Sequence, residues 1–368
     1  MVMGLLEEIR PARDGSGLPL VALAHNEANL IQPFLAHYRA LGPTHFIIVD
    51  DHSTDGTRAM LEGQPDVTLL RPVPGSTYAE HKLAWRREIL DRHAAGRWVL
   101  LPDLDEHFVF AGMETQPLAA YLAALDAEGA EAVLTVMIDM YADRPLRDHV
   151  YPQDASQTLL QAFPCFDGPG AAPYGYHFLY GSAKARRAAA TPPLLVHGGL
   201  RDRLFRVPGL RPSGLALAML DRVAGLDGAV TPRGAALLKH RLSRRLTRGF
   251  FKGALEMQKL GLCRWRPGTS FVGAHRLREP YRMSESIAAF LHFKFTRGTA
   301  GLEYTAARGQ HFAGARHYVE MLDSAEILAR SPVFEGSRRY EGSHSLKSIL
   351  RGPGNEQDRR DAGDCTAA

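Results

Sequence analysis

The sequence predicts an α/β protein in which a mixed, mainly parallel sheet is flanked by helices and followed by a C-terminal helical elaboration. Two observations lead to this prediction. Short β-rich apolar runs alternate with helical patterns over the first 140 residues, and polar clusters follow three of the runs at their C-terminal ends. Repeated strand-helix units of this length are typical of parallel sheets with right-handed crossovers.

The expected elements follow one another in a regular order. Strands are predicted at residues 18–24, 45–49, 67–70, 97–101 and 132–137, and helices at residues 30–41, 57–62, 78–93 and 118–127. Residues 145–193, which are rich in Pro, Gly and aromatic residues, are expected to form a loop region that covers a site. Further along, the pattern predicts a basic helix at 237–262 and strand-like runs at 271–274 and 287–295.

The chain divides into four segments on this pattern. An extension of residues 1–17 precedes a main domain of residues 18–300, whose two halves are 18–140 and 141–300. A helical segment is expected at 301–330. Beyond about Ser331 the sequence is rich in Gly, Ser and Arg with few apolar residues, which predicts a poorly ordered tail from 331 to 368.

Composition narrows the class of protein. The chain has 368 residues, of which 45% are hydrophobic and 23% charged, enough to bury a large core. It has no apolar run of membrane-spanning length, and acids occupy the N-terminal region where a secretory signal needs an apolar core, so we expect a cytoplasmic protein. Cys165, Cys263 and Cys365 are far apart in sequence and suggest neither a disulfide framework nor a thiolate zinc site.

Charge is distributed unevenly along the chain. The formal net charge is +4, and residues 184–282 contain far more Arg than acid, which predicts contact with an anionic ligand or surface. No zinc-finger spacing or aromatic RNA-recognition pattern is present, so nucleic acid is not the expected partner.

Acidic and amide residues follow the predicted strands at 25–27, 50–53 and 103–106. Because ligands of parallel sheets bind beyond the carboxyl ends of the strands, these clusters are expected at one edge of one sheet. Helix capping would explain Ser53 and Thr54 but not the adjacent acids Asp50 and Asp51. If residues 103–105 are extended, Asp103 and Asp105 point the same way and can face one divalent cation.

Together these motifs resemble a known family. The stretch LVALAHNEANLIQPFLAHYRALGPTHFIIVDDHSTDGT, followed by DLDE at 103–106, resembles the bacterial glycosyltransferase family 2-like proteins. The resemblance is dense over residues 18–110 and touches HGGLRDRLF (197–205), residues 265–275 and LHFKF (291–295). It implies a GT-A fold, with the nucleotide-sugar half at 18–140 and the acceptor half at 141–300.

The resemblance also implies a reaction. A sugar would pass, with inversion, from a UDP- or GDP-sugar to a hydroxyl of a cell-surface glycan or lipid-linked acceptor, assisted by Mn²⁺ or Mg²⁺. The implied metal ligands are Asp103, Asp105 and His292, with His275 and His197 as weaker candidates for the histidine; Asp103 would contact the ribose or a metal-bound water. The implied nucleotide contacts are Asn26, Glu27, and one or both of Asp50 and Asp51.

Other roles remain open between alternatives. An inverting transferase needs a general base, and Asp202 and Asp139 are the candidates, with Asp167 as a further acid in the CFDG segment. Arg201 would bind phosphate or belong to surface charge together with Arg203 and Arg206. For Lys82 and Arg86, an exposed helix face is favoured over a phosphate contact.

The basic segment 237–262 has two interpretations. It could pack on the domain with a basic outer face, or lie on an anionic membrane surface and give peripheral membrane association. Two other functions are also compatible with the motifs: a metal-dependent nucleotidyltransferase or phosphoesterase, and a non-catalytic basic scaffold that binds an anionic surface.

Overall fold

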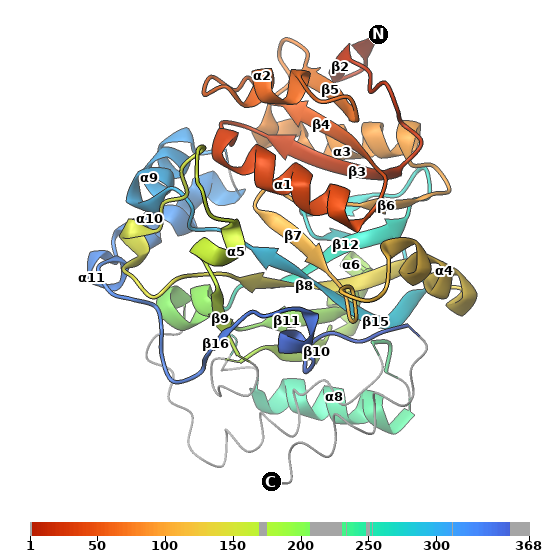
Figure 1. The fold of residues 1–368 in the computed structure, drawn as a ribbon. Helices are drawn as coiled ribbons and strands as arrows, with labels where there is room; N and C mark the ends of the chain where they lie inside the picture. The colour runs from red at the N-terminus through yellow and green to blue at the C-terminus, as the bar shows by residue number, and fades with distance from the viewer. Residues whose placement is uncertain are drawn as a thin grey trace.

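The computed structural model describes residues 2–168, 175–206, 230–232, 234–247, 251, 253–310 and 312–353. Within these ranges, ten strands form one mixed sheet, which runs through the middle of the molecule (Figure 1). Their order in the sheet is β1 (Val2–Met3), β2 (Leu6–Arg10), β5 (Val67–Pro72), β4 (Thr44–Asp50), β3 (Leu18–Ala24), β6 (Trp98–Leu100), β12 (Gln258–Arg264), β8 (Ala132–Asp139), β15 (Met283–His292) and β7 (Glu106–Val109).

One half of the sheet is parallel and reverses its strand order at β3. The chain passes from β3 outward to β4 and β5, and then returns to place β6 on the other side of β3, with all four strands parallel. In open α/β sheets, such a reversal leaves a crevice beyond the carboxyl ends of the two central strands. The crevice here is bordered by the residues that follow Ala24 and Leu100.

The other half of the sheet mixes strand directions. β12 is antiparallel to both β6 and β8, β15 is parallel to β8, and β7 is antiparallel to β15. At the far edge β2 is antiparallel to β5, so part of the 1–17 extension belongs to the sheet. The prediction of a mixed, mainly parallel sheet in an α/β protein is confirmed.

Helices cover both faces of the sheet. α1 (Ala28–Leu41), α2 (Thr57–Glu62) and α4 (Leu118–Glu128) pack on one face, and α3 (Tyr78–His93) packs on the other. Within β3 the side chain of Leu20 lies in the cluster with α1, whereas that of its neighbour Val21 lies in the cluster with α3. A strand covered on both sides must be apolar throughout, which explains the unbroken apolar runs of the sequence.

Shorter elements complete the structure. A group of helices after β15 comprises α9 (Gly298–Arg308), η3 (Phe312–Ala315), α10 (Arg316–Leu322) and α11 (Ala325–Leu328). The remaining elements are η1 (Leu146–Asp148), α5 (Leu159–Ala162), β9 (Cys165–Asp167), β10 (His177–Tyr180), α6 (Ala183–Ala188), β11 (Leu194–His197), the π-helical turn η2 (Asp202–Arg206), α8 (Gly234–Thr247), β13 (Phe271–Val272), β14 (Arg276–Leu277), β16 (Ser337–Arg339) and η4 (Ser343–Leu346). None of the helices in the described part of the chain is long and apolar enough to cross a membrane.

The predicted basic helix at 237–262 is wrong in its second half. The helix α8 ends at Thr247, and residues 258–264 form β12 in the middle of the sheet. A helix with a basic outer face would expose Lys259, but its side chain is fully buried against Asp103 and Glu106. Gly261 permits this close packing, because a Cβ atom there would lie 2.6 Å from Oγ1 of Thr135. Residues 248–250 and 252 of the predicted helix lie outside the described residues.

The expectations of a poorly ordered tail and of an unstructured region at 145–193 also need correction. As far as Pro353 the tail is packed: β16 pairs with β9, and Leu346, Ile349 and Leu350 are buried in the core. The tail has few apolar residues, but these three pack into the hydrophobic core. Residues 354–368 lie outside the described residues. Region 145–193 contains short helices and strands, and its residues 169–174 are likewise outside the description.

A stacked pair of histidines, His107 buried and His37 half-buried, connects α1 to β7. The rings of His37 and His107 stack with centroids 4.3 Å apart. Burial lowers the pKa of His37 to about 4, against the opposing effect of its hydrogen bond to the Phe108 carbonyl, and burial also holds the pKa of His107 well below its usual value. Both rings are therefore neutral in the folded protein at neutral pH, and protonating either one opposes folding.

We predict an acid-sensitive stability from this pair. Because the folded pKa values are depressed, the full stability is present above about pH 6.5 and is lost as the pH falls toward about 4, with a slope of at most about 1.4 kcal/mol per pH unit for each histidine. His107→Phe should reduce this slope in urea unfolding measurements, whereas His344→Gln, at an exposed histidine, should leave it unchanged. An equal slope in H107F and the native protein would contradict the prediction.

Candidate functional site

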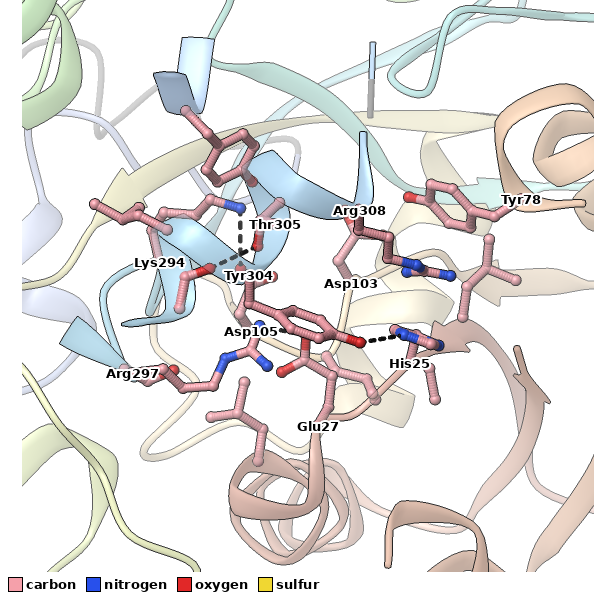
Figure 2. A pocket seen from close by; sticks show the side chains of 18 of the residues that line it. His25, Glu27, Tyr78, Asp103, Asp105, Lys294, Arg297, Tyr304, Thr305 and Arg308 are labelled. Atoms are coloured by element: carbon pink, nitrogen blue, oxygen red, sulfur yellow. Dashed lines mark hydrogen bonds and ion pairs between the residues drawn. The ribbon is translucent and has the colours of Figure 1, made fainter. Parts of the chain in front are cut away.

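A polar pocket lies at the crevice where the strand order reverses. Its walls come from the ends of β3 and β6, from the start of α3 and from α9 (Figure 2). The polar residues that line it are His25, Glu27, Tyr78, Asp103, Asp105, Lys294, Thr296, Arg297, Tyr304, Thr305, Arg308 and Tyr318. No residue in the described part of 145–193 lines this pocket, so the expected cover is provided by α9 instead.

The D-x-D motif lies in the turn between two strands rather than in a strand. β6 ends at Leu100 and β7 begins at Glu106, and Asp103, Leu104 and Asp105 lie between them. Leu104 is buried, and both aspartates line the pocket. The expectation that alternation in a strand aims the two carboxylates at one ion is therefore wrong, because the turn sends them to different partners.

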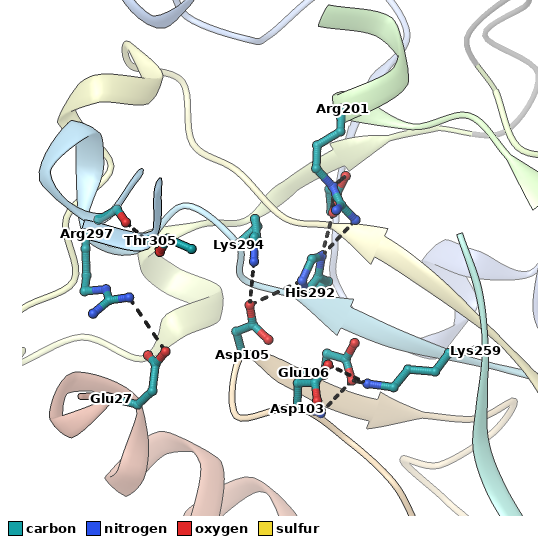
Figure 3. Close-up of polar contacts among 12 residues, drawn as sticks. Glu27, Asp103, Asp105, Glu106, Arg201, Lys259, His292, Lys294, Arg297 and Thr305 are labelled. Atoms are coloured by element: carbon teal, nitrogen blue, oxygen red, sulfur yellow. Dashed lines mark hydrogen bonds and ion pairs between the residues drawn. The ribbon is translucent and has the colours of Figure 1, made fainter. Parts of the chain in front are cut away.

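Asp103 is held by two cations of the protein, Arg86 and Lys259, the second of which is shown in Figure 3. One carboxylate oxygen accepts from Arg86 at 2.5 Å, and the other accepts from Lys259 at 2.8 Å. Burial alone would raise the pKa of Asp103, but Lys259 and Arg86 outweigh it and hold this pKa well below its usual value. Both cations compete with a metal ion for this carboxylate, but its side chain is 40% exposed and lines the pocket, so the role of Asp103 as a metal ligand stays a prediction.

Lys259 also pairs with the third acid of the motif. Its ammonium group lies 2.6 Å from Oε2 of Glu106, and the same oxygen accepts the Asp103 backbone N–H at 2.7 Å. Glu106 is 1% exposed and Lys259 is 0% exposed, so the pair is removed from solvent. Burial raises the pKa of Glu106, against the opposing charge of Lys259. The cluster fixes the turn that carries Asp105.

Asp105 points to a second set of partners. Its Oδ2 lies 3.3 Å from Nε2 of His292 and 3.9 Å from Nζ of Lys294. On the other side of the ring, Nδ1 of His292 lies 2.6 Å from Asp139, which also pairs with Arg201 at 2.9 Å. Burial would raise the pKa of Asp105 and lower that of His292. The attraction between the two charged groups outweighs burial, so the pKa of Asp105 is lowered and that of His292 is raised.

Asp105 and His292 fit a divalent cation. Magnesium and manganese sites commonly use one or two protein ligands and complete their shell with phosphate oxygens and water. In metal sites, the histidine nitrogen that does not bind the metal usually contacts a carboxylate or a carbonyl, which orients the ring. Nδ1 of His292 makes such a contact with Asp139. Among the described residues, no group of three or more His, Cys, Asp or Glu side chains could hold a metal, so the protein would supply only this pair.

Helix α9 forms the opposite wall and contacts the clusters that follow β3 and β4. The Tyr304 hydroxyl lies 2.6 Å from Nε2 of His25 and accepts from the Asn26 side-chain amide at 2.7 Å. Just before the helix, Arg297 donates to the Asn26 carbonyl at 2.9 Å and lies 3.7 Å from Glu27. At its C-terminal end Arg308 pairs with Asp51. The helix therefore brings two guanidinium groups to the pocket.

The predicted nucleotide contacts are only partly exposed to the pocket. Glu27 lines it with a side chain that is 25% exposed, and burial raises its pKa to about 7 while Arg297 opposes the shift. Asn26 is beside the pocket, where its side-chain oxygen accepts from the Thr54 N–H at 2.7 Å. Asp50 and Asp51 are buried behind it; Asp50 accepts from the Ser53 N–H, and Asp51 is paired with Arg308.

The acids predicted as the general base do not reach the pocket. Asp139 is 0% exposed and is held by Arg201 and His292. Asp202 is 2% exposed and accepts from the backbone N–H groups of Gly198 and Leu255. Both carboxylates have structural partners, which argues against either one as the base.

The other predicted site residues also have structural roles. Arg201 is buried against Asp139 and does not line the pocket, so the phosphate contact predicted for it is not supported. Nδ1 of His197 donates to the Leu255 carbonyl at 2.8 Å, and the ring stacks on Phe251. Burial lowers the pKa of His275 to about 3, with Lys259 adding to the effect, and this ring also lies outside the pocket lining.

Several pocket residues were missed in the sequence. Lys294 lies within the LHFKF motif, where a lysine in an apolar run was a usable signal. Tyr304 and Arg308 are four positions apart, a helical spacing that places them on one face of α9, and Arg297 is the residue just before this helix. Lys259 offered no local signal, because its partners lie more than 150 positions away.

We predict that Lys259 is essential for stability. Lys259→Met leaves Glu106 buried without its cation and should lower the free energy of unfolding by about 3 kcal/mol near pH 7. The loss should shrink as the pH falls, because protonation of Glu106 removes the unpaired charge. K259M/E106Q should recover part of the loss in urea unfolding, and Lys184→Met, at an exposed lysine, is the control. A loss below about 1 kcal/mol in K259M would show that the cluster is dispensable.

Comparison with known proteins assigns no family. The chain matches no model of a protein family, and no curated protein is significantly similar to it. The pocket geometry and the motif resemblance described above are therefore the basis for a functional proposal.

Proposed function

We propose that the chain is a glycosyltransferase with a GT-A-like domain that transfers a sugar from a nucleotide-diphosphate donor, a UDP- or GDP-sugar, to a hydroxyl of an acceptor glycan. The observation that carries the proposal is the pairing of Asp105 with His292 in a pocket at the point where the strand order reverses. This is the position where α/β sheets bind nucleotides, and it coincides with the motifs that resemble family 2-like transferases.

The charges of the pocket suit a diphosphate. Lys294, Arg297 and Arg308 line it from one side, and the first two lie near Asp105 and Glu27. Ammonium and guanidinium groups stabilise the charge that develops on a departing diphosphate. A bound Mn²⁺ or Mg²⁺, held by Asp105 and His292, would supply further positive charge to the same group.

The aromatic residues support a nucleoside contact. Tyr304 stacks with His25 at a centroid distance of 6.0 Å, and Tyr78 also lines the pocket, with Arg308 between it and His25 (Figure 2). Arg308 is close to both features, with its guanidinium 5.6 Å from the Tyr78 ring. Aromatic rings stack on nucleobases whichever base is bound, because every base has a flat π-face. This end of the pocket is therefore the proposed nucleoside site.

Glu27 is the proposed general base. It lines the pocket, and its pKa of about 7 suits a group that accepts a proton from a hydroxyl near neutral pH. The other carboxylates of the lining are Asp103 and Asp105, whose pKa values are held low by adjacent cations. They are weaker proton acceptors than Glu27 for this reason.

We predict donor binding that depends on metal. In a thermal-shift panel of UDP-, GDP-, CMP- and dTDP-sugars with and without Mn²⁺, a UDP- or GDP-sugar with Mn²⁺ should raise the melting temperature. A ligand that binds only the folded state stabilises it by about 2.7 kcal/mol at a hundredfold excess over its dissociation constant. Asp105→Asn and His292→Gln should remove the metal-dependent part of the shift.

The matched control for this panel is Asp323→Asn, an exposed aspartate at the C-terminal end of α10 and outside the pocket lining, which should behave like the native protein. Absence of a shift with every donor in the presence of Mn²⁺ would refute the proposed donor class. A shift with nucleoside triphosphates alone would instead favour nucleotidyl transfer.

We predict that Glu27→Gln separates binding from turnover. Loss of a general base typically lowers the rate by a factor of about 100 to 10,000, so sugar transfer should fall by that range while the donor-induced thermal shift persists. The native rate should decline below about pH 7, as Glu27 becomes protonated, and E27Q should lack this decline. Unchanged turnover in E27Q would rule out the assigned role.

A further inference from the structure

Helix α8 exposes an apolar stripe on its outer face. Leu238 and Leu242, one helical turn apart, are 67% and 57% exposed, which makes them the most exposed large hydrophobic side chains reported for the described residues. The inner face packs on β10, where His240 is buried and its ring lies 6.2 Å from that of Tyr180. Surface helices normally turn their leucines toward the protein core, whereas Leu238 and Leu242 face outward.

The same stripe carries positive charge. Arg241 and Arg245 are exposed next to the two leucines, at positions that share their side of the helix. The sequence of α8, GAALLKHRLSRRLT, contains no acid. The outer face therefore carries exposed leucines and exposed arginines side by side.

A neighbouring helix extends the basic surface. On α6, Lys184 and Arg187 are exposed, while the guanidinium of Arg186 lies 4.2 Å from the centroid of the Tyr180 ring. The Tyr180 ring also contacts His240 of α8, so the two helices are neighbours. We call the outer face of α8, with Leu238, Arg241, Leu242 and Arg245, the α8 surface.

We propose that the α8 surface docks the protein on an anionic lipid bilayer, with Leu238 and Leu242 inserted among the acyl chains and the arginines at the phosphate groups. Exposed leucines beside arginines are the composition of helices that lie in the membrane interface. A helix of 14 residues is about 21 Å long and too short to cross the hydrocarbon core, so it lies parallel to the bilayer. The absence of acids in α8 favours an anionic surface.

The test is sedimentation of the full-length chain with large vesicles. We expect binding to vesicles of phosphatidylcholine and phosphatidylglycerol, no binding to phosphatidylcholine alone, and release by salt. Arg241→Gln and Arg245→Gln should each weaken binding about fivefold, the equivalent of about 1 kcal/mol per charge. L238S/L242S should abolish binding at the same lipid concentration.

Matched controls come from other exposed positions. Val319→Ser removes a side chain that is 45% exposed on α10, and Arg316→Gln removes one that is 79% exposed; both should bind like the native protein. Circular dichroism of L238S/L242S should match that of the native protein, because the replaced side chains make little contact in the fold. Its metal-dependent donor shift should also persist, which separates failure of this proposal from failure of the proposed transferase function.

The proposal is overturned by any of three results. These are no binding of the native chain to anionic vesicles, equal binding to neutral and anionic vesicles, or unchanged binding of L238S/L242S. Binding to heparin or nucleic acid that is lost in R241Q/R245Q but retained in L238S/L242S, without vesicle binding, would identify a site for soluble polyanions and would likewise overturn it.

Discussion

The ion cluster around Lys259 is the interaction on which the site depends. A lysine with no exposed surface sits on a central strand and neutralises Asp103 and Glu106, the first and last acids of the DLDE motif. Charges removed from water destabilise a protein unless they are paired and hydrogen-bonded, and here each has such a partner. Because the two outer acids are tied to β12, the turn between β6 and β7 has one arrangement, and in it Asp105 faces the pocket. The cluster around Lys259 thus fixes the turn that presents Asp105 to the pocket.

The pocket combines a rigid wall with one built from a single helix. On the sheet side, Asp105 and His292 are backed by Asp139 and Arg201, so their orientation is set by buried ion pairs. On the other side, α9 contributes Arg297, Tyr304 and Arg308, which contact the residues after β3 and β4. Each cation is already near an acid of the protein. A phosphorylated ligand would therefore compete with internal ion pairs, and its affinity would reflect the difference between the two sets of contacts rather than the full attraction of the free charges.

Local sequence patterns were sufficient to predict most of the strands and helices in the parallel half of the fold. The predicted strand at 18–24 and helices at 57–62 and 78–93 have the bounds of β3, α2 and α3, because the apolar periodicity of these segments matches their burial. The same method failed at 258–264. There a lysine and a glycine interrupt the apolar run, yet the segment is a central strand, since Lys259 finds two acids inside the core and Gly261 admits close neighbours. Leu346, Ile349 and Leu350 were likewise too few to signal order, although each is buried.

The sequence by itself determined which strands carry acids at their ends, and therefore at which edge of the sheet a polar site forms. It also indicated His292 and Asp105, which the fold brings to 3.3 Å from each other. Only the tertiary structure decided which charges are paired. Asp103 meets Lys259 across 156 positions of the chain, and Asp51 meets Arg308 across 257. Local periodicity carries no information about such partners, because electrostatic pairing depends on distance in space, and that distance is set by the packing of strands and helices that are remote in the sequence.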